Sequence, residues 1–301
     1  MKFLSLPQNG ASWRDRLPYA IDLETTEASV AKVVILNTDS NESLATFNIY
    51  GVITAEFDIA PYLRSALQST PPTSAGFRHS PLSCNVAVSV NDTLSEPRLY
   101  TSAPLDTSTP QLMSTLPESP HIALGESICF AAYAKHSVVV TLGFYGKKSR
   151  VTSYNIATQG RPVEFFYPLQ SADDNLSEIL LDIAFDGRRA GRYTYKYVER
   201  SSTALQVVWR STNGGLESYL FPQLVRCRCK YNTTTGAEYT YTLATAHEDP
   251  DTLRRISQII FSEEVYVITR GKWHGVRLLT REMEAGKSNI EITITTNKSI
   301  L

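Results

Sequence analysis

The amino-acid sequence predicts an all-β protein, built mainly of antiparallel β-sandwich domains with one or two short helices. Three observations predict this class. Short runs rich in β-branched and aromatic residues recur along all 301 residues, and apolar and polar positions alternate within many of them. Gly, Pro, Asn and Asp separate these runs, as expected for turns between strands. Only two segments place apolar residues three and four positions apart, which is the spacing of a helix.

The N-terminal half contains six expected strands, over residues 19–24, 30–36, 45–50, 85–90, 127–134 and 137–145. The last two lie so close together that we expect them to form a hairpin. Asp58 and Pro61 mark a short helix within 57–67, which we expect to plug the end of a sandwich. Two polar stretches, 68–83 and 91–126, are rich in Ser, Thr and Pro. We expect them to be surface loops, or arms that become ordered against neighbouring subunits.

A break near residue 150 divides the chain into two expected domains, 1–150 and 151–301. Gly146 to Arg150 form a basic turn, and Pro162 interrupts the strand pattern soon afterwards. We expect the first domain to be a β-sandwich with long Pro/Ser/Thr-rich loops. The second should be a β-rich domain with one short helix.

The expected strands of the second half cover residues 163–167, 178–185, 192–198, 225–231, 238–243, 264–269, 273–280 and 289–296. A hairpin is expected over 205–221, because Asn213, Gly214 and Gly215 supply the backbone freedom that a tight reversal requires. The helix is expected at about 250–261, since Asp249 is a good capping residue and a proline follows it in the first turn.

Charge and hydropathy argue against several kinds of partner. The formal net charge is −1, so nothing draws the whole chain to nucleic acid, and we expect no nucleic-acid partner. No segment has the length and hydrophobicity of a membrane-spanning helix, which predicts no membrane insertion. The apolar beginning before Pro7 is too short for the core of a signal peptide, so synthesis in the cytoplasm is expected.

The four cysteines are consistent with a reducing compartment. Cys84 and Cys129 lie in apolar runs, whereas Cys227 and Cys229 are two positions apart and would point the same way on a strand. A metal at that pair would require two further ligands, and no motif supplies them. We therefore expect buried or half-buried free thiols, no metal and no cofactor.

The sequence contains none of four common catalytic motifs: G-x-S-x-G, G-x-x-x-x-G-K-[ST], G-x-G-x-x-G and H-E-x-x-H. Two carboxylate pairs remain, Asp173 with Asp174 and Asp182 with Asp186. We interpret them as turn residues rather than as the acid and base of a glycosidase. The sequence therefore predicts no catalytic residues and no enzymatic activity.

Tyr193, Tyr195 and Tyr197 alternate along one expected strand, so their rings share a face. Such a row is typical of a partly buried sheet face or of the centre of a protein interface, and less often of a platform on which sugars stack. Arg226 and Arg228 alternate with the cysteines, which indicates a solvated strand face or a charged contact between subunits. The expected interface residues are Tyr193, Tyr195, Tyr197, Arg226, Arg228 and, from the hairpin, Trp209 and Phe221.

Two stretches resemble a known family. They are Trp209 to Gly215 with the following Tyr219 and Phe221, continued in residues 260–266 and 271–276, and residues 57–64 in the first half. Their pattern is similar to that of tail-associated virion proteins of phages and prophages of the Bacteroides group.

The resemblance implies a non-enzymatic structural subunit of a phage tail or baseplate, made in the bacterial cytoplasm and located in the virion. Its hairpin residues would be structural. Its partners would be other copies of itself and other virion proteins, held through strand edges and through the extended arm 91–126.

Two other functions stay open at this point. A carbohydrate-binding β-sandwich, serving receptor binding or surface adhesion, would bind glycans on the tyrosine row. A hydrolase would require carboxylates that converge in a cleft.

Overall fold

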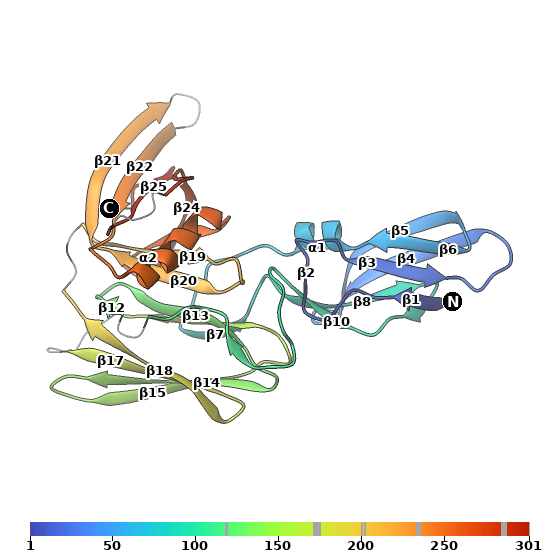
Figure 1. The fold of residues 1–301 in the computed structure, drawn as a ribbon, viewed down its shortest axis with the longest axis horizontal. Helices are drawn as coiled ribbons and strands as arrows, with labels where there is room; N and C mark the ends of the chain where they lie inside the picture. Colours follow the sequence, from blue (N-terminus) through green and yellow to red (C-terminus); the bar gives the residue numbers. More distant parts are fainter. Residues whose placement is uncertain are drawn as a thin grey trace.

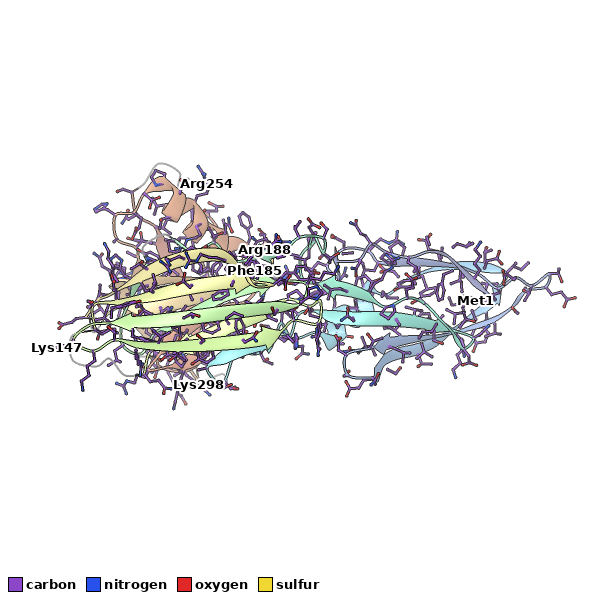
Figure 2. The ribbon with its side chains drawn as sticks, turned by 90° about the horizontal axis from the view of Figure 1, so that it is seen from below. Met1, Lys147, Phe185, Arg188, Arg254 and Lys298 are labelled. Carbon is purple, nitrogen blue, oxygen red and sulfur yellow. The ribbon has the colours of Figure 1, made fainter. Side chains whose placement is uncertain are left out.

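The computed structural model describes residues 1–301 apart from 118–119, 171–175, 200, 202, 233–235, 284–287 and 301. The described residues form five β-sheets with two short α-helices and one 3-10 helix, which confirms the all-β class. The molecule is elongated, with one β-rich unit at one end and two units packed side by side at the other (Figure 1). Met1 and Lys147 lie near opposite ends of the long axis (Figure 2).

The N-terminal unit is a sandwich of two sheets around one apolar core. The three-stranded sheet has the order β1-β3-β6, and the six-stranded sheet has the order β2-β10-β8-β4-β5 with β9 paired to β8. The strands are β1 (Lys2–Ser5), β2 (Ala11–Ser12), β3 (Pro18–Asp22), β4 (Ser29–Asn37), β5 (Glu42–Val52), β6 (Thr54–Asp58), β8 (Cys84–Val90), β9 (Thr93–Leu94) and β10 (Arg98–Thr101). Helix α1 (Ala60–Ala66) buries Leu63 against this core, as the expected plug would.

The middle unit is a second sandwich, with a four-stranded sheet of order β11-β13-β16-β7 and a five-stranded sheet of order β12-β18-β17-β14-β15. The strands are β7 (Gly76–His79), β11 (Gln111–Leu112), β12 (His121–Ile122), β13 (Ser127–Tyr133), β14 (Ser137–Tyr145), β15 (Arg150–Ala157), β16 (Val163–Pro168), β17 (Glu178–Phe185) and β18 (Arg188–Tyr197). Alternate residues of β17, beginning with Ile179, turn inward to the core, as its period-two pattern predicts.

The C-terminal unit is a seven-stranded sheet of order β20-β19-β23-β24-β25-β22-β21 that curves around a helix. The strands are β19 (Leu205–Arg210), β20 (Leu216–Phe221), β21 (Gln223–Asn232), β22 (Gly236–Ala244), β23 (Val265–Thr269), β24 (Lys272–Leu278) and β25 (Glu291–Thr296). Strands β19 and β20 form the expected hairpin. Helices α2 (Pro250–Ser257) and η1 (Gln258–Phe261) occupy the expected helical segment, and the Asp249 carboxylate caps α2 by accepting two backbone hydrogen bonds of 2.9 Å.

Strands β13 and β14 do not form the hairpin that their closeness in sequence predicted. β13 pairs with β11 and β16, whereas β14 pairs with β15 and β17, so the two lie in opposite sheets. Every residue of β13 is buried. One face of β13 packs on the middle core and the other on the C-terminal unit, so the short link after it carries the chain from one sheet to the other.

The expected domain boundary at residue 150 lies inside the middle unit and is corrected here. β14 and β15 pair along their length, from Ser137 opposite Ala157 to Phe144 opposite Arg150. The basic turn is therefore a hairpin turn. Three hydrophobic cores, one in each unit, replace the two expected domains. A hairpin turn and a linker have the same local composition, which is why the sequence did not separate them.

The two polar stretches are not free arms. Within 68–83, β7 enters the middle sheet before the chain returns to the N-terminal unit as β8. Within 91–126, Tyr100, Leu105 and Met113 are buried. The chain thus crosses between the N-terminal and middle units three times, and these crossings hold the two units together.

A specific protease site inserted between Lys147 and Lys148 tests the corrected boundary. We expect cleavage to leave the two fragments associated, because β14 stays paired with β15 and β17 across the cut. Size-exclusion chromatography of the nicked protein should give one peak at the intact elution volume, and urea should separate the fragments. Two peaks under native conditions would restore the boundary at 150.

Candidate functional site

A buried carboxylate joins the middle unit to the C-terminal unit. The side chain of Glu164, on β16, is fully buried, and its Oε2 accepts hydrogen bonds from Nε and Nη2 of Arg78 at 2.9 and 2.6 Å. Its Oε1 accepts from Nη2 of Arg210 at 2.8 Å and from the Ser80 hydroxyl at 3.0 Å. Because β7 supplies Arg78 and β19 supplies Arg210, three strands that are distant in sequence meet at one residue.

Arg210 extends this cluster into the C-terminal unit. Its Nε pairs with Glu264 at 3.1 Å, and its Nη1 donates to the carbonyl of Gly214 at 2.9 Å. Burial works to raise the pKa of Glu164, but the adjacent Arg210 and Arg78 outweigh it and hold that pKa below its ordinary value. Glu164 is therefore ionised in the folded protein. We call Arg78, Glu164, Arg210 and Glu264 the junction cluster.

Two further side chains bind backbone groups across the same junction. The Gln206 amide accepts a hydrogen bond from the N–H of Ser127 at 2.8 Å and donates to its carbonyl at 2.7 Å. Glu217 accepts from the N–H of Thr115 at 2.7 Å. These bonds satisfy buried backbone groups of the middle unit with side chains of the C-terminal unit, so separating the units would leave them unpaired.

The turn of the β19–β20 hairpin also lies in this junction. Gly214 has a φ of +81° and lies against Met113 and Ser102. A Cβ on Gly215 would lie 2.0 Å from the carbonyl oxygen of Met113. The glycines therefore provide the expected turn geometry, and Gly215 also permits a close approach of two backbones that the sequence does not reveal.

Three of the seven expected interface residues are buried and two more are half-buried against the core, which corrects their assignment. Trp209 and Phe221 are 0% exposed, and Tyr195 is 6% exposed. Tyr193 and Tyr197 are half-buried and pack on the middle core. The tyrosine row is thus the inward face of β18, which agrees with the partly buried sheet face that its alternation favoured.

Asp182 and Asp186 each have a structural partner. The Asp182 carboxylate accepts two hydrogen bonds from Arg192, at 2.8 and 2.9 Å, and these bonds lower its pKa. The Asp186 carboxylate accepts from the N–H groups of His136 and Ser137 at 3.0 and 2.7 Å. Both carboxylates thus hold the middle sandwich together. Residues 173 and 174, the other expected pair, lie outside the described residues.

Arg226 and Arg228, the remaining two expected interface residues, are exposed. They lie on a ribbon of two strands, β21 and β22, that extends beyond α2 (Figure 1). Lys230 is exposed on the same face, two residues further along β21. Within the described parts of the chain, none of these three cations has a carboxylate at ion-pair distance. Lys230 lies opposite Glu238 on β22, whereas Arg226 and Arg228 lie opposite threonines, so these two arginines are the cations most available to a partner.

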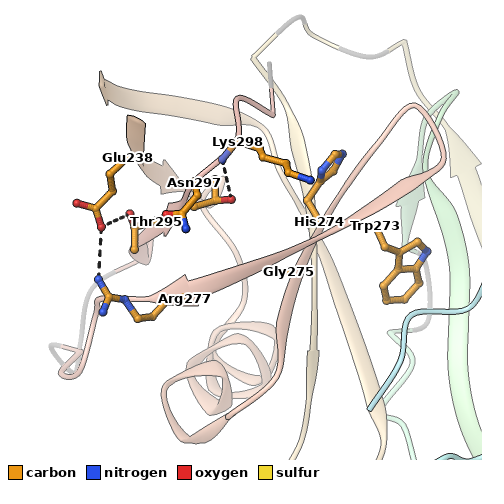
Figure 3. A pocket seen from close by; sticks show the side chains of 9 residues that line it. Glu238, Trp273, His274, Gly275, Arg277, Thr295, Asn297 and Lys298 are labelled. Atoms are coloured by element: carbon orange, nitrogen blue, oxygen red, sulfur yellow. Dashed lines mark hydrogen bonds and ion pairs between the residues drawn. The ribbon is translucent and has the colours of Figure 1, made fainter. Parts of the chain in front are cut away.

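The polar side chains of this face continue across the sheet. Arg228 lies opposite Thr240 on β22, which lies opposite Thr295 on β25. Thr295 in turn lies opposite Arg277 on β24. Glu238 accepts a hydrogen bond from the Thr295 hydroxyl at 3.1 Å and pairs with Arg277 at 3.4 Å (Figure 3). We call this side of the sheet, which carries Arg226, Arg228, Lys230, Glu238, Thr240, Arg277 and the buried Thr295, the basic face.

An open cavity of about 680 Å³ lies at the far end of the basic face. It is lined by Glu238, Trp273, His274, Gly275, Arg277, Thr295, Thr296, Asn297 and Lys298. Figure 3 shows Lys298 reaching toward His274. Burial lowers the pKa of His274, and Lys272 and Lys298 lower it further, so His274 is neutral at pH 7. With Arg277 and Lys298 against Glu238, the cavity has a positive balance.

The opposite face of the ribbon carries Cys227 and Cys229. Both are exposed, contrary to the expected half-buried thiols, because the ribbon extends past the core. Tyr241, opposite Cys227, is fully buried, whereas Tyr231, nearer the tip, is 74% exposed.

Within the residues that the structure describes, no group of three or more side chains is placed to hold a metal ion. No described helix is both long and apolar enough to span a membrane.

Sequence reasoning missed the contribution of Glu238, Thr295, Arg277 and Lys298. They come from three strands and a terminal segment that are neighbours only in the folded sheet. The one available signal was the alternation in 289–296, where threonines face away from the buried isoleucines. That signal marks a polar face but does not say which strands lie beside it.

No family model matches the chain, and no curated protein matches it. Among solved structures, it is similar to the chicken interferon gamma receptor alpha chain at 8% identity, over 65% of this chain and 98% of that one, with a TM-score of 0.19. It is also similar to the FN1–FN3 domains of chicken CNTN1 at 7% identity, over 97% of this chain and 96% of that one, with a TM-score of 0.19. Likenesses this distant carry no functional argument, so function is inferred from the surfaces described above.

Replacing Glu164 with Gln is expected to destabilise the protein strongly, because the buried Arg210 would keep only Glu264 as a counter-ion and the partly exposed Arg78 would lose its own. Urea denaturation should show a loss of about 3–5 kcal/mol in the free energy of unfolding. Glu56→Gln is the control, because its ion pair with Arg16 at 3.4 Å is exposed to solvent on both sides. The control should lose less than about 1 kcal/mol. Equal losses would contradict the role of the junction cluster.

The ionised Glu164 also predicts a pH dependence. Its pKa lies below the ordinary value of 4.5, so the stability it contributes is fully present above pH 4.5 and is lost as the pH falls through the lowered value. The free energy of unfolding of Glu164→Gln should therefore fall less steeply than that of the unmodified protein below pH 4.5. Parallel pH curves for the two proteins would exclude this linkage.

Gly215→Ala is expected to destabilise the junction, because the new Cβ would meet the Met113 carbonyl at 2.0 Å. The atoms that the Cβ would meet belong to the backbone of Met113 and Ser114, which cannot rotate away as a side chain can. We therefore expect the free energy of unfolding to fall by at least about 2 kcal/mol, measured by thermal or urea denaturation. Gly275→Ala is the control, because the nearest atom to its Cβ, on Tyr266, is 4.0 Å away. We expect that change to be within about 0.5 kcal/mol. A tolerated Gly215→Ala would mean that the hairpin turn moves freely.

Proposed function

We propose that the chain is a structural subunit of a phage tail or baseplate that binds other proteins through the β21–β22 ribbon. The observation that carries this proposal is the ribbon itself, an edge strand with unpaired cations that projects from the body (Figure 1). Exposed strand edges are common sites of protein association, because their backbone groups can pair with another chain.

The rigidity of the body supports a structural role. The buried ion pair between Glu164 and Arg210, at 2.8 Å, joins the middle and C-terminal units, and three chain crossings join the middle and N-terminal units. A ribbon on such a body keeps a fixed position relative to the far end. An assembly subunit requires that property, because its neighbours must meet at set distances and angles. The resemblance at Trp209 to Gly215 and at 57–64 supplies the class of assembly.

The proposed mode of assembly differs from the one expected from the sequence in one respect. The segment 91–126 was expected to act as an arm exchanged between subunits. Its buried Tyr100, Leu105 and Met113 belong to the fold of a single chain. The proposal therefore relies on the strand edge alone.

Glycan binding is a second candidate, favoured by one feature. The cavity beside the basic face offers Asn297, Glu238 and Thr296, which provide donors and acceptors for sugar hydroxyls. A glycan array probed with the intact protein and with Asn297→Ala tests it. Saturable binding lost in the variant would favour this function, and a blank array would remove it.

Particles purified from a strain that produces the chain test the proposed function. We expect quantitative mass spectrometry to find the chain in a fixed ratio to other particle proteins. Arg226→Glu with Arg228→Glu should lower that ratio at least about tenfold, because a charge reversal at a contact changes binding by about 1.4 kcal/mol or more. Arg254→Glu, on the exposed side of α2, should leave it unchanged. Particles without the chain would refute the proposal.

A further inference from the structure

We infer that β21 binds an extended acidic segment of a different protein as an additional strand, with carboxylates at alternate positions opposite Arg226, Arg228 and Lys230. This inference names the partner class of the ribbon and so rests on the proposed function. Three observations support it: the free edge of β21, the alternating cations along this strand, and the repulsion that a second copy of β21 would meet there.

The edge of β21 is open. β21 has ten residues and is the last strand of the seven-stranded sheet, so on one side it has no strand neighbour among the described residues. Its pairing with β22 shifts register between Leu224 and Arg226 and is regular from there to Asn232. The regular part offers one row of backbone donors and acceptors, which is what an added strand requires.

The side chains along this edge select the sequence that can pair with it. Arg226, Arg228 and Lys230 occupy alternate positions, so all three point to the basic face. Side chains directly opposite one another on paired strands have Cβ atoms about 5 Å apart, within reach of an ion pair. A matching strand therefore carries Glu or Asp at every second residue.

The partner residues between its carboxylates would lie on the other side of the ribbon, beside thiols and a tyrosine. Cys227, Cys229 and Tyr231 point to the other side of the ribbon, where all three are exposed. Small or apolar residues between the carboxylates would cover them. Arg277, across the sheet, adds a further cation to the basic face, although Glu238 pairs with it at 3.4 Å.

A second copy of β21 does not fit this edge. Antiparallel self-pairing about a two-fold axis normal to the sheet keeps the basic faces of both copies on the same side. Centred on Arg228, it would place Arg228 against Arg228 and Arg226 against Lys230. Like charges directly opposite one another destabilise strand pairs, so β21 does not pair favourably with β21 of a second copy.

The other edge strands of this chain are also poorly matched. Of these, β6 carries two carboxylates at alternate positions, Glu56 and Asp58. Asp58 already accepts from the N–H groups of Leu17 and Ala60 at 2.8 and 2.9 Å. Arg16 lies 3.4 Å from Glu56. Both carboxylates are thus engaged within their own chain, which leaves a different protein as the partner.

Peptide binding to the full chain tests the inference. The probe is a capped peptide, Thr-Glu-Val-Glu-Val-Glu-Thr, and its matched controls carry Gln or Lys in place of Glu. Titration followed by amide NMR shifts should show saturable binding of the Glu peptide with shifts concentrated on β21. The Gln peptide should bind at least about tenfold more weakly, and the Lys peptide should not bind at concentrations up to about 1 mM. Raising the salt from about 50 to about 500 mM should weaken the Glu peptide.

Variants identify the residues that select the peptide. Arg226→Glu with Arg228→Glu should lose the Glu peptide and gain affinity for the Lys peptide, with an unchanged circular dichroism spectrum. Arg254→Glu should bind as the unmodified protein does. Equal affinity for the three peptides, shifts concentrated on another edge such as β15, or no binding of the Glu peptide would each overturn the inference.

The particle experiment separates this inference from the proposed function. A chain that is present in particles but does not prefer the Glu peptide would reject the acidic partner and leave the structural role standing. A chain that prefers the Glu peptide but is absent from particles would reject the structural role and leave the acidic partner standing.

Discussion

The buried carboxylate of Glu164 is the constraint on which the arrangement of the C-terminal unit depends. An ionised group without access to water must keep its partners, because removing one leaves an uncompensated charge in a medium that solvates it poorly. Its partners, Arg78 and Arg210, come from strands 86 and 46 positions away in sequence. Once these two bonds form, β7, β16 and β19 are fixed relative to one another. The remaining contacts of the junction, such as Gly215 against Met113, can then be close, because the backbones that meet there do not slide.

This constraint also explains where the molecule can interact with others. Trp209 and Phe221, two aromatic residues of the hairpin, are buried in the core beside the junction. The tyrosine row of β18 packs on the core of the middle sandwich. What remains outside is a ribbon that extends past its own helix, so that cations and thiols lie on its two faces. Aromatic residues, which are common at protein interfaces, were therefore a poor guide here, since cores use the same residues. Exposure distinguished the two uses, and exposure depends on which strands pair.

Much of the local structure could be predicted from the sequence. Most of the longer strands, the β19–β20 hairpin and the helix beginning after Asp249 follow from patterns within a few residues, namely alternation, turn glycines and a capping carboxylate. Strands β7, β10 and β15 were not predicted. The mistakes concern relations between segments. β13 and β14 are adjacent in sequence but pair with other strands, and the turn at Gly146 looked like a linker. The stretch 91–126 looked like a free arm because its buried residues are scattered among prolines and serines.

The candidate site shows the same division. The sequence by itself determined that Arg226 and Arg228 share one strand face and that the cysteines share the other, because a strand alternates its side chains with a period of two. Only the tertiary structure decided that this strand is an edge, that its ribbon projects from the core, and that Arg277 and Thr295 continue the same face. The physical reason is that alternation is a property of a single strand, whereas neighbours in a sheet are chosen by burial and by charge pairing between residues far apart in the chain, as Arg78, Glu164 and Arg210 show.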